Sequence, residues 1–196
     1  MDTTQSPATP IVFLKGKRLY LRPVLEQDLD KLVVWINDPE IRRFLASYLP
    51  QSPQDEKQWL ENMAKKKDTD LVFAIVLKEN NEQIGNIGLH GINHRQGTAH
   101  TGTLIGRKDL WSKGYGSEAK MILLDYAFGT LNLRKINTSV FATNPRSLKC
   151  QKKCGYQPEG VLKQQRRLNH EWVDEVLLAV FREDFLPLWE KFKEDL

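Results

Sequence analysis

The chain has 196 residues, of which 40% are hydrophobic and 28% are charged. This length suits one domain with a substantial core, and the composition excludes a wholly disordered chain; no apolar run is long enough to span a bilayer. The net charge of +4 and the isoelectric point near 9 permit nucleic-acid binding but suit a small polyphosphate ligand equally well.

The N-terminal residues 1–10 are polar and contain prolines, without the basic start or the apolar stretch of a secretory signal. We therefore expect a flexible tail over residues 1–12, a single domain over residues 13–196 and a cytoplasmic location. The two cysteines, Cys150 and Cys154, are four residues apart in a segment with helical character, which places both on one helix face. No further Cys or clustered His completes a ligand set, so we expect buried thiols and no metal.

The first half of the chain predicts two helices followed by an antiparallel meander. Residues 18–24 alternate between apolar and polar as in a strand, and apolar residues at helical spacing follow until Asn37-Asp38-Pro39 ends that helix. A second helix is predicted from Ser52 as N-cap to residue 67. Three strands then follow, over residues 71–77, 83–92 and 98–105, with turn residues between them.

The second half alternates between helices and strands. The predicted elements are an amphipathic helix over residues 117–128, a strand over 135–141, a helix over 147–154 and strands over 160–165 and 172–181. Strands that first run together and later alternate with helices indicate an α/β or α+β domain with a single mixed sheet. We expect about seven strands, mostly antiparallel, flanked by helices.

A loop with two glycines precedes the helix predicted from residue 117. In such a loop several backbone N–H groups point toward one place, and the helix N-terminus adds partial positive charge, so the loop suits a pyrophosphate. Gly114 and Gly116 permit close approach of the backbone to a ligand. The loop has neither the GxGxxG spacing nor the GK[ST] ending of a Walker loop, which disfavours hydride transfer and nucleotide hydrolysis.

Residues 105–119, IGRKDLWSKGYGSEA, resemble the "IGxxxxWGKGYGTEA" signature of GNAT superfamily N-acetyltransferases in the RimJ/RimL-like branch, near the polyamine acetyltransferases. The resemblance covers nearly the whole domain. Its other parts are the opening LYLRPV, WINDPEIRRFL at residues 35–45, IGNIGL at 84–89, and Asn144-Pro145-Arg146-Ser147 leading to Lys153-Cys154-Gly155-Tyr156. It implies the GNAT fold and acetyl-CoA as cosubstrate.

The resemblance also implies which residues bind the coenzyme. The strand before the loop would pair its backbone with pantetheine, and the loop would surround the phosphates. Asn144 would hydrogen-bond the pantetheine arm, and its alternative role is that of a turn residue before proline. The residues so implied are Leu104, Ile105, Gly106, Lys113, Gly114, Tyr115, Gly116, Ser117 and Asn144.

The chain departs from the family where proton transfer is concerned. Many relatives have a tyrosine seven residues after Asn144 as proton donor to the coenzyme thiolate, and here that position is Gln151, whose amide is no ordinary acid. Ser147 is the nearest motif-matched hydroxyl, with a helix-start residue as its other interpretation.

For the general base, His100 occupies the place where relatives often carry a glutamate, and imidazole titrates near neutrality. A structural strand histidine is the alternative. Asp174 and Glu175 are the acidic candidates for the same role, and either is otherwise a solvated strand residue.

The sequence as a whole predicts an acetyl-CoA-dependent N-acetyltransferase. The acetyl group would pass by direct attack in a ternary complex to a primary amine: a protein N-terminus, a polyamine, an aminoglycoside or an amino sugar. The alternative is a non-catalytic module on the same scaffold that binds coenzyme A, or the ribosome through Arg166 and Arg167. We expect a small-molecule or peptide acceptor, no DNA or membrane partner, and, from the family, a homodimer.

Overall fold

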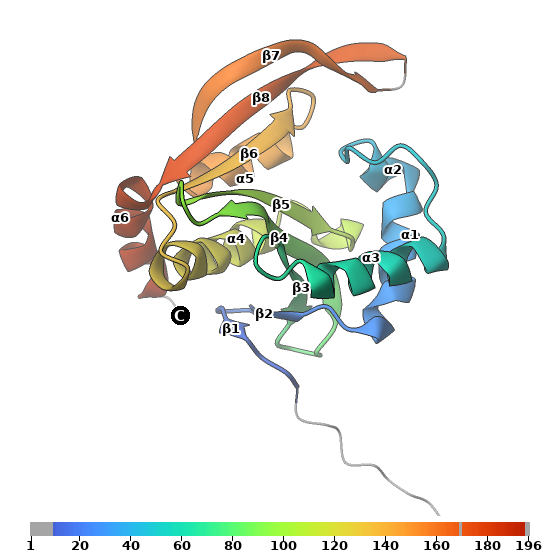
Figure 1. Ribbon diagram of the computed structural model, residues 1–196, viewed down its shortest axis with the longest axis horizontal. Helices are drawn as coiled ribbons and strands as arrows, with labels where there is room; N and C mark the ends of the chain where they lie inside the picture. The colour runs from blue at the N-terminus through green and yellow to red at the C-terminus, as the bar shows by residue number, and fades with distance from the viewer. Residues whose placement is uncertain (1–9, 169, 195–196) are drawn as a thin grey trace, which may run out of the picture.

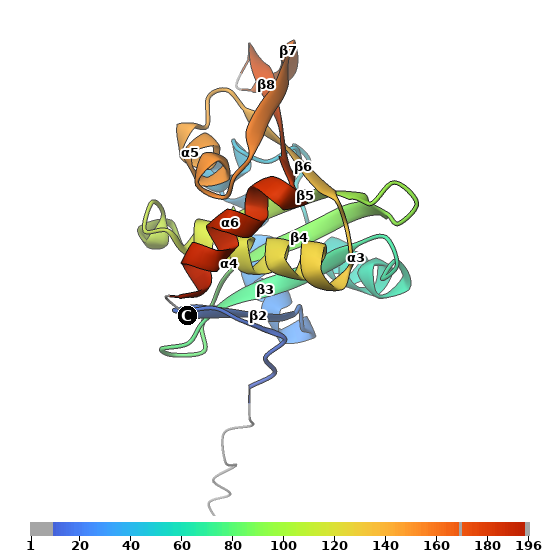
Figure 2. The ribbon, with the colours of Figure 1, turned by 90° about the vertical axis from the view of Figure 1, so that its left-hand side faces the viewer.

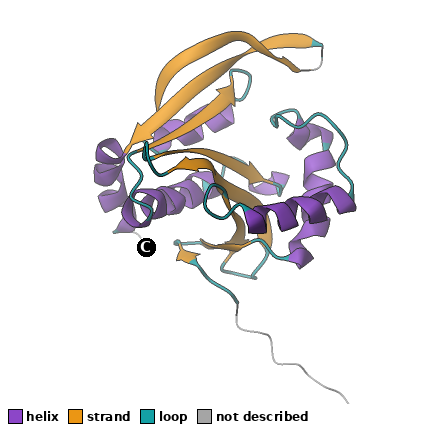
Figure 3. Cartoon of the chain, viewed as in Figure 1, coloured by secondary structure: helices purple, strands orange, loops and turns teal. Residues whose placement is uncertain are grey.

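A single open sheet of eight strands organises the computed structural model, which describes residues 10–168 and 170–194 (Figures 1 and 3). The strand order is β1-β2-β3-β4-β5-β6-β8-β7. Every neighbouring pair is antiparallel except β5 and β6, which run parallel. The strands are β1 (Leu14–Lys15), β2 (Leu19–Pro23), β3 (Leu71–Leu77), β4 (Gln83–Asn93), β5 (Thr98–Ile105), β6 (Lys135–Phe141), β7 (Gln157–Leu168) and β8 (Glu171–Phe181).

The parallel pair β5–β6 is short, and the two strands then diverge. Only Thr98–His100 on β5 pair with residues of β6, whereas β6 stays paired with β8 as far as Phe141. Beyond His100 the side chain of Thr138 still reaches β5, donating to Thr101 O at 3.0 Å. The remainder of β5 pairs with β4 on one side only, so the sheet opens at its centre.

Helices cover both faces of the sheet. In Figure 2, α4 (Tyr115–Asp125) and α6 (Arg182–Lys193) lie on the near face, and α1 (Leu29–Asn37) and α3 (Pro53–Lys65) lie on the far side. Two shorter helices, α2 (Pro39–Arg42) and α5 (Pro145–Lys153), complete the set. The main core lies between the sheet and α4 with α6, and a second cluster places α1 against the side chain of Leu104.

The predicted fold class is confirmed, with eight strands where about seven were expected. The strands predicted over residues 71–77, 98–105 and 135–141 are correct to the residue, and Ser52 caps α3 in a reciprocal capping box with Asp55. The predicted strand over 160–165 is too short, because β7 extends over Gln157–Leu168. The predicted helix start at Ser117 is also two residues late.

Three of the strands and α-helices are absent from the sequence-based prediction. One is β1, which has only two residues and therefore no periodicity. Another is α2, which has only four residues and begins at Pro39, where the sequence indicated the end of the preceding helix. The third is α6, which contains Pro187, a residue that normally interrupts helices. The predicted tail over residues 1–12 falls mostly on residues 1–9, which lie outside the described residues, and the single domain over 13–196 stays a prediction.

Candidate functional site

A cavity of about 560 Å³ lies where β5 and β6 diverge. Its wall includes β5, β6, the loop before α4, one face of α5 and the segment after α2. A further part of the wall comes from the long β7–β8 hairpin, which projects beyond the rest of the sheet (Figure 1). The loss of strand pairing thus creates a site lined by main-chain as well as side-chain groups.

The glycine loop forms one end of the cavity. Gly114, with φ of 87°, is the N-cap of α4 and offers no capping side chain, so the N–H groups of the first helical turn are left for a ligand. Gly114 to Ser117 all line the cavity. Arg18 braces the loop from outside: it donates to Lys113 O at 3.0 Å, and its guanidinium lies 4.2 Å from the Tyr115 ring centroid.

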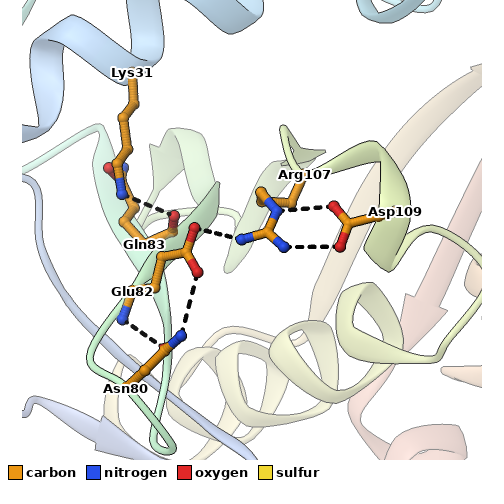
Figure 4. A network of polar contacts seen from close by, with 6 residues as sticks. All are labelled: Lys31, Asn80, Glu82, Gln83, Arg107 and Asp109. Carbon is orange, nitrogen blue, oxygen red and sulfur yellow. Dashed lines mark hydrogen bonds and ion pairs between the residues drawn. The ribbon is translucent and has the colours of Figure 1, made fainter.

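A polar network fixes the segment that leads from β5 into this loop (Figure 4). Arg107, which follows β5, donates to both oxygens of Asp109 at 2.8 and 2.7 Å, and also to Glu82 on the β3–β4 turn. The hydrogen bonds from Arg107 outweigh burial and lower the pKa values of both carboxyl groups. Through Arg107, the network connects the segment between β5 and the loop to the β3–β4 turn.

The face of α5 toward the cavity is strongly basic. Arg146, Lys149 and Lys153 all line the cavity, as their i, i+3, i+7 spacing on one helix face permits. The Arg146 guanidinium also lies 3.8 Å from the Trp111 ring centroid. Sequence reasoning missed this basic face, although the spacing is visible in the sequence. Together with the helix N-terminus of α4, it makes this end of the cavity suitable for a polyphosphate.

The backbone of β5 alternates between its two sides. Thr101 O accepts from Thr138 Oγ1, and Ile105 O accepts from Trp111 Nε1 at 2.7 Å, so both carbonyls face away from β4. A Cβ added at Gly85 of β4 would collide with Leu104 O, which therefore faces β4. Because main-chain groups alternate along a strand, the donors on the open side belong to Thr103 and Ile105. The main-chain N–H of Leu104 faces β4, although its side chain lines the cavity.

Two of the predicted coenzyme residues lie outside the cavity lining. Gly106 donates its N–H to Ile84 O at 2.8 Å, and a Cβ there would collide with the Trp35 ring. Position 106 is therefore a glycine because Trp35 of α1 packs closely against it. Lys113 is exposed and is not among the lining residues.

Asn144, Ser147 and Gln151 are brought together on the cavity side of α5. Asn144 Oδ1 accepts from Ser147 N at 3.1 Å and so caps the helix, which leaves the amide nitrogen of Asn144 for a ligand. Gln151 is 4% exposed, and within residues 10–168 and 170–194 its Oε1 has no hydrogen-bond partner. Ser147 lies in the first turn of α5, as either interpretation of that residue requires.

The two cysteines lie beside a buried lysine. Cys150 lines the cavity, whereas Cys154 and Lys120 are buried. A hydrogen bond from Cys154, aided by the charge of Lys120, lowers the pKa of Cys150 to about 6. The same hydrogen bond and burial raise the pKa of Cys154, and burial lowers the pKa of Lys120. The Lys120 ammonium lies 3.4 Å from Thr101 Oγ1 and 5.3 Å from the Tyr156 ring centroid.

The acid–base candidates divide between the cavity and the surface. His100 lines the cavity, as does Glu175, which is 4% exposed and accepts from Ser139 Oγ at 2.5 Å and Arg166 Nε at 3.0 Å. Burial raises the pKa of Glu175, but these hydrogen bonds outweigh it and leave the pKa lowered.

The neighbouring carboxylate, Asp174, is outside the cavity lining. It accepts from Lys163 Nζ at 2.8 Å and from Gln164 N at 2.9 Å. Consecutive residues of a strand face opposite sides. The alternation along β8 therefore turns Glu175 toward the cavity and Asp174 away from it.

Residues 18–157 match the family model described as "Acetyltransferase (GNAT) domain". The chain belongs to the GNAT acetyltransferase family. It is 29% identical to the uncharacterized N-acetyltransferase p20 of Bacillus licheniformis over 88% of this chain and 97% of that protein. It is 25% identical to spermidine N(1)-acetyltransferase of Escherichia coli K12 over 85% of this chain and 87% of that enzyme.

The fold also agrees with solved structures. The crystal structure of spermidine N-acetyltransferase from Vibrio cholerae, in complex with CoA and spermine, superimposes with a TM-score of 0.80 over 86% of this chain and 98% of that one. Its identity to this chain is 22%, so this likeness bears on the fold alone.

Family membership makes the chain an acetyl-CoA-dependent acetyltransferase, with acetyl-CoA as its cosubstrate. Within the described ranges, no helix is long and apolar enough to cross a membrane. In the same part of the chain, no group of three or more His, Cys, Asp or Glu side chains is placed to hold a metal ion.

Proposed function

We propose that this enzyme transfers the acetyl group of acetyl-CoA to the nitrogen of a primary amine, by direct attack while both substrates occupy the cavity. The divergence of β5 from β6 is the observation that carries the proposal. It provides a cavity that begins at a helix N-terminus suited to phosphates and continues along an unpaired strand edge.

The coenzyme would lie along that edge. Its phosphates would meet the N–H groups of residues 114–117 and the cations of Arg146, Lys149 and Lys153. Its pantetheine arm would pair with the open-side main-chain groups of Thr103 and Ile105. Holding the thioester and the amine together in this way removes much of the entropic barrier to attack.

The charges at the other end of the cavity disfavour an acceptor with several positive charges. Among the described residues, Glu175 is the sole carboxylate of the cavity lining, and Arg166 already offsets its charge. A polyamine with several ammonium groups would find little compensation there. We therefore favour a peptide N-terminus or a small monoamine over a polyamine.

A screen of acceptors tests the proposal. Acetyl-CoA is supplied with spermidine, a short peptide with a free N-terminus, glucosamine or kanamycin, and the released coenzyme thiol is measured. We expect coenzyme A to raise the melting temperature and at least one single-amine acceptor to release thiol faster than spermidine. No stabilisation by saturating coenzyme A, or no amine-dependent thiol release, contradicts the proposed function; preference for spermidine contradicts the acceptor class.

A further inference from the structure

A histidine other than His100 is held by a carboxylate at the edge of the cavity. His90 of β4 lines the cavity, and its Nδ1 lies 3.2 Å from Asp70 Oδ1. Asp70 directly precedes β3, and the antiparallel register that pairs Leu71 with Leu89 brings it beside His90 although the two are 20 residues apart.

The surroundings of Asp70 favour its ionised form. Its side chain is 20% exposed. Partial burial raises its pKa, but hydrogen bonds from Thr69 Oγ1 at 2.8 Å, from His90 and from the backbone of Gly91 outweigh burial and lower it. An ionised carboxylate only accepts hydrogen bonds, so it selects the His90 tautomer that carries its proton on Nδ1. The lone pair of the neutral ring is then on Nε2.

The free ring nitrogen is directed over the centre of the sheet. A Cβ added at Gly88 would lie 2.8 Å from His90 Nε2, and one added at Gly102 would lie 3.9 Å from it. Nε2 therefore lies above glycines of both β4 and β5, on the side of His90 that faces along β5 toward Leu104. The missing side chain at Gly88 makes room for the ring in this orientation.

This position matches the reactive end of the coenzyme under the proposed function, on which the inference rests. The phosphates would lie at residues 114–117, just beyond the end of β5, and the arm would run back along the open edge. At about 3.4 Å per residue, the stretch from Gly106 to Gly102 spans about 14 Å. The acyl group would then lie near Gly102, where His90 Nε2 points.

We propose that Asp70 and His90 form a dyad in which His90 Nε2 is the general base of acetyl transfer and Asp70 is the positioning residue that orients its ring. The amine nitrogen forms a bond to the thioester carbonyl carbon, and the C–S bond breaks with its electron pair on sulfur. His90 Nε2 accepts the proton that the amine nitrogen loses. The coenzyme thiolate takes up one proton from solvent, which gives free thiol and amide, and His90 later releases its proton to solvent.

The surroundings of His90 distinguish it from His100. The two residues are direct cross-strand partners, and both line the cavity. His90 has a carboxylate beside Nδ1, whereas His100 is exposed and its ring makes no hydrogen bond with another described residue. The remaining charged groups of this part of the cavity are Glu175 and Arg166, which are paired with each other. The proposal therefore places the base on β4, at the cross-strand partner of the residue that the sequence suggested.

Substitutions test the dyad on the acceptor that the wild-type enzyme acetylates fastest among spermidine, the short peptide, glucosamine and kanamycin. We expect His90→Asn to lower kcat/KM about 100-fold or more, the ordinary scale of general-base catalysis, with unchanged coenzyme A affinity. Asp70→Asn should lower kcat with little change in KM. His94→Asn is the matched control. His94 lies on the same hairpin, its Nε2 is 3.2 Å from Asp68 O, and it is outside the cavity lining. The activity of the His94→Asn enzyme should therefore equal that of the wild type.

A measurement without acceptor makes the test independent of the acetylation assay. Nitrogen-15 NMR of the histidine rings should show neutral His90 protonated at Nδ1, and Asp70→Asn should weaken this preference, because the asparagine amide can donate as well as accept hydrogen bonds. Wild-type His90 protonated at Nε2, or a His90→Asn enzyme with more than half of the wild-type kcat/KM, overturns the dyad. A loss confined to His100→Asn also overturns it. If the wild-type enzyme releases no thiol with any amine, the proposed function fails and the tautomer measurement still decides the dyad.

Discussion

Replacement of Gly116 by alanine should change stability and coenzyme affinity in opposite directions. Gly116 lies in the first turn of α4 with φ outside the left-handed region, so alanine fits its backbone. The added Cβ would lie 3.8 Å from Ile105 Cγ1 and 3.9 Å from Cys150 Sγ, which are ordinary contacts. A compatible Gly→Ala change stabilises by about 0.4–1 kcal/mol, because it restricts the unfolded chain. For a chain of this size, that corresponds to a melting temperature higher by about 1–4 °C.

The same methyl group should weaken coenzyme binding. Both of its neighbours line the cavity, so it would stand where a phosphate oxygen has to approach the backbone N–H groups. We expect the Kd for coenzyme A, measured by calorimetry, to rise at least tenfold, which corresponds to about 1.4 kcal/mol. Gly129→Ala is the control, since Gly129 is also helical but has nothing within 4 Å of an added Cβ and is outside the cavity lining.

Gly114→Ala separates backbone strain from obstruction. At Gly114 an added Cβ meets only Arg18 Nη2, at 3.4 Å, but the φ of 87° is costly for alanine, by about 1–2 kcal/mol. Gly114→Ala should therefore destabilise the protein, whereas Gly116→Ala should not. A Gly116→Ala protein that is more stable and binds coenzyme A with wild-type affinity would refute the placement of the phosphates on this loop.

Three further predictions concern the rest of the cavity. Asn144→Asp keeps the oxygen that caps α5 but removes the amide donor, so it should weaken coenzyme A binding without loss of stability. Gln151→Ala should reduce turnover less than Asn144→Ala does. A larger loss of turnover in Gln151→Ala than in Asn144→Ala, measured in steady-state assays, contradicts the role of the Asn144 amide. Because the pKa of Cys150 is lowered to about 6, iodoacetamide at pH 7 should alkylate Cys150 before Cys154. Coenzyme A should slow this alkylation at least tenfold, as followed by mass spectrometry, because Cys150 lines the cavity. Alkylation at an unchanged rate would place the coenzyme elsewhere. Because the pKa of Glu175 is lowered in the fold, its anion stabilises the fold above about pH 4.5, and this contribution is lost as the pH falls through the lowered value. Glu175→Gln should therefore lower the free energy of unfolding, measured with urea, at pH 7 and lower it progressively less on acidification. An equal loss at every pH would contradict this.

The sequence predicted those elements in which local signals agree. The strands over 71–77 and 135–141 are apolar or alternating and are bounded by turn residues, and Ser52-Pro53 marks a helix start in two independent ways. The glycine loop was found for a similar reason, because its residues form a contiguous run. Where a segment carries a contrary signal, as Pro187 does in α6, tertiary packing decided the structure and the prediction missed it.

The acid–base residues depend on register, which sequence patterns specify poorly. Asp70 and His90 meet only because β3 and β4 pair with Leu71 opposite Leu89. In the same way, side chains alternate along a strand, so the sequence predicts that Asp174 and Glu175 face opposite sides of the sheet. Only the pairing of β8 with β6 and β7 shows that Glu175 is the one that faces the cavity. A sequence-based search therefore lists candidate acid–base residues more readily than it shows which of them lie together in the cavity.

The open edge of β5 has a consequence for how far such a sequence can diverge. Main-chain N–H and C=O groups are the same whichever side chain a residue carries, so a binding edge built from them is insensitive to most substitutions along the strand. An opening of this kind can accordingly persist while the sequence along the strand changes. The side chains that surround the opening, including those on β7 and β8, are then free to change with the amine that each enzyme accepts.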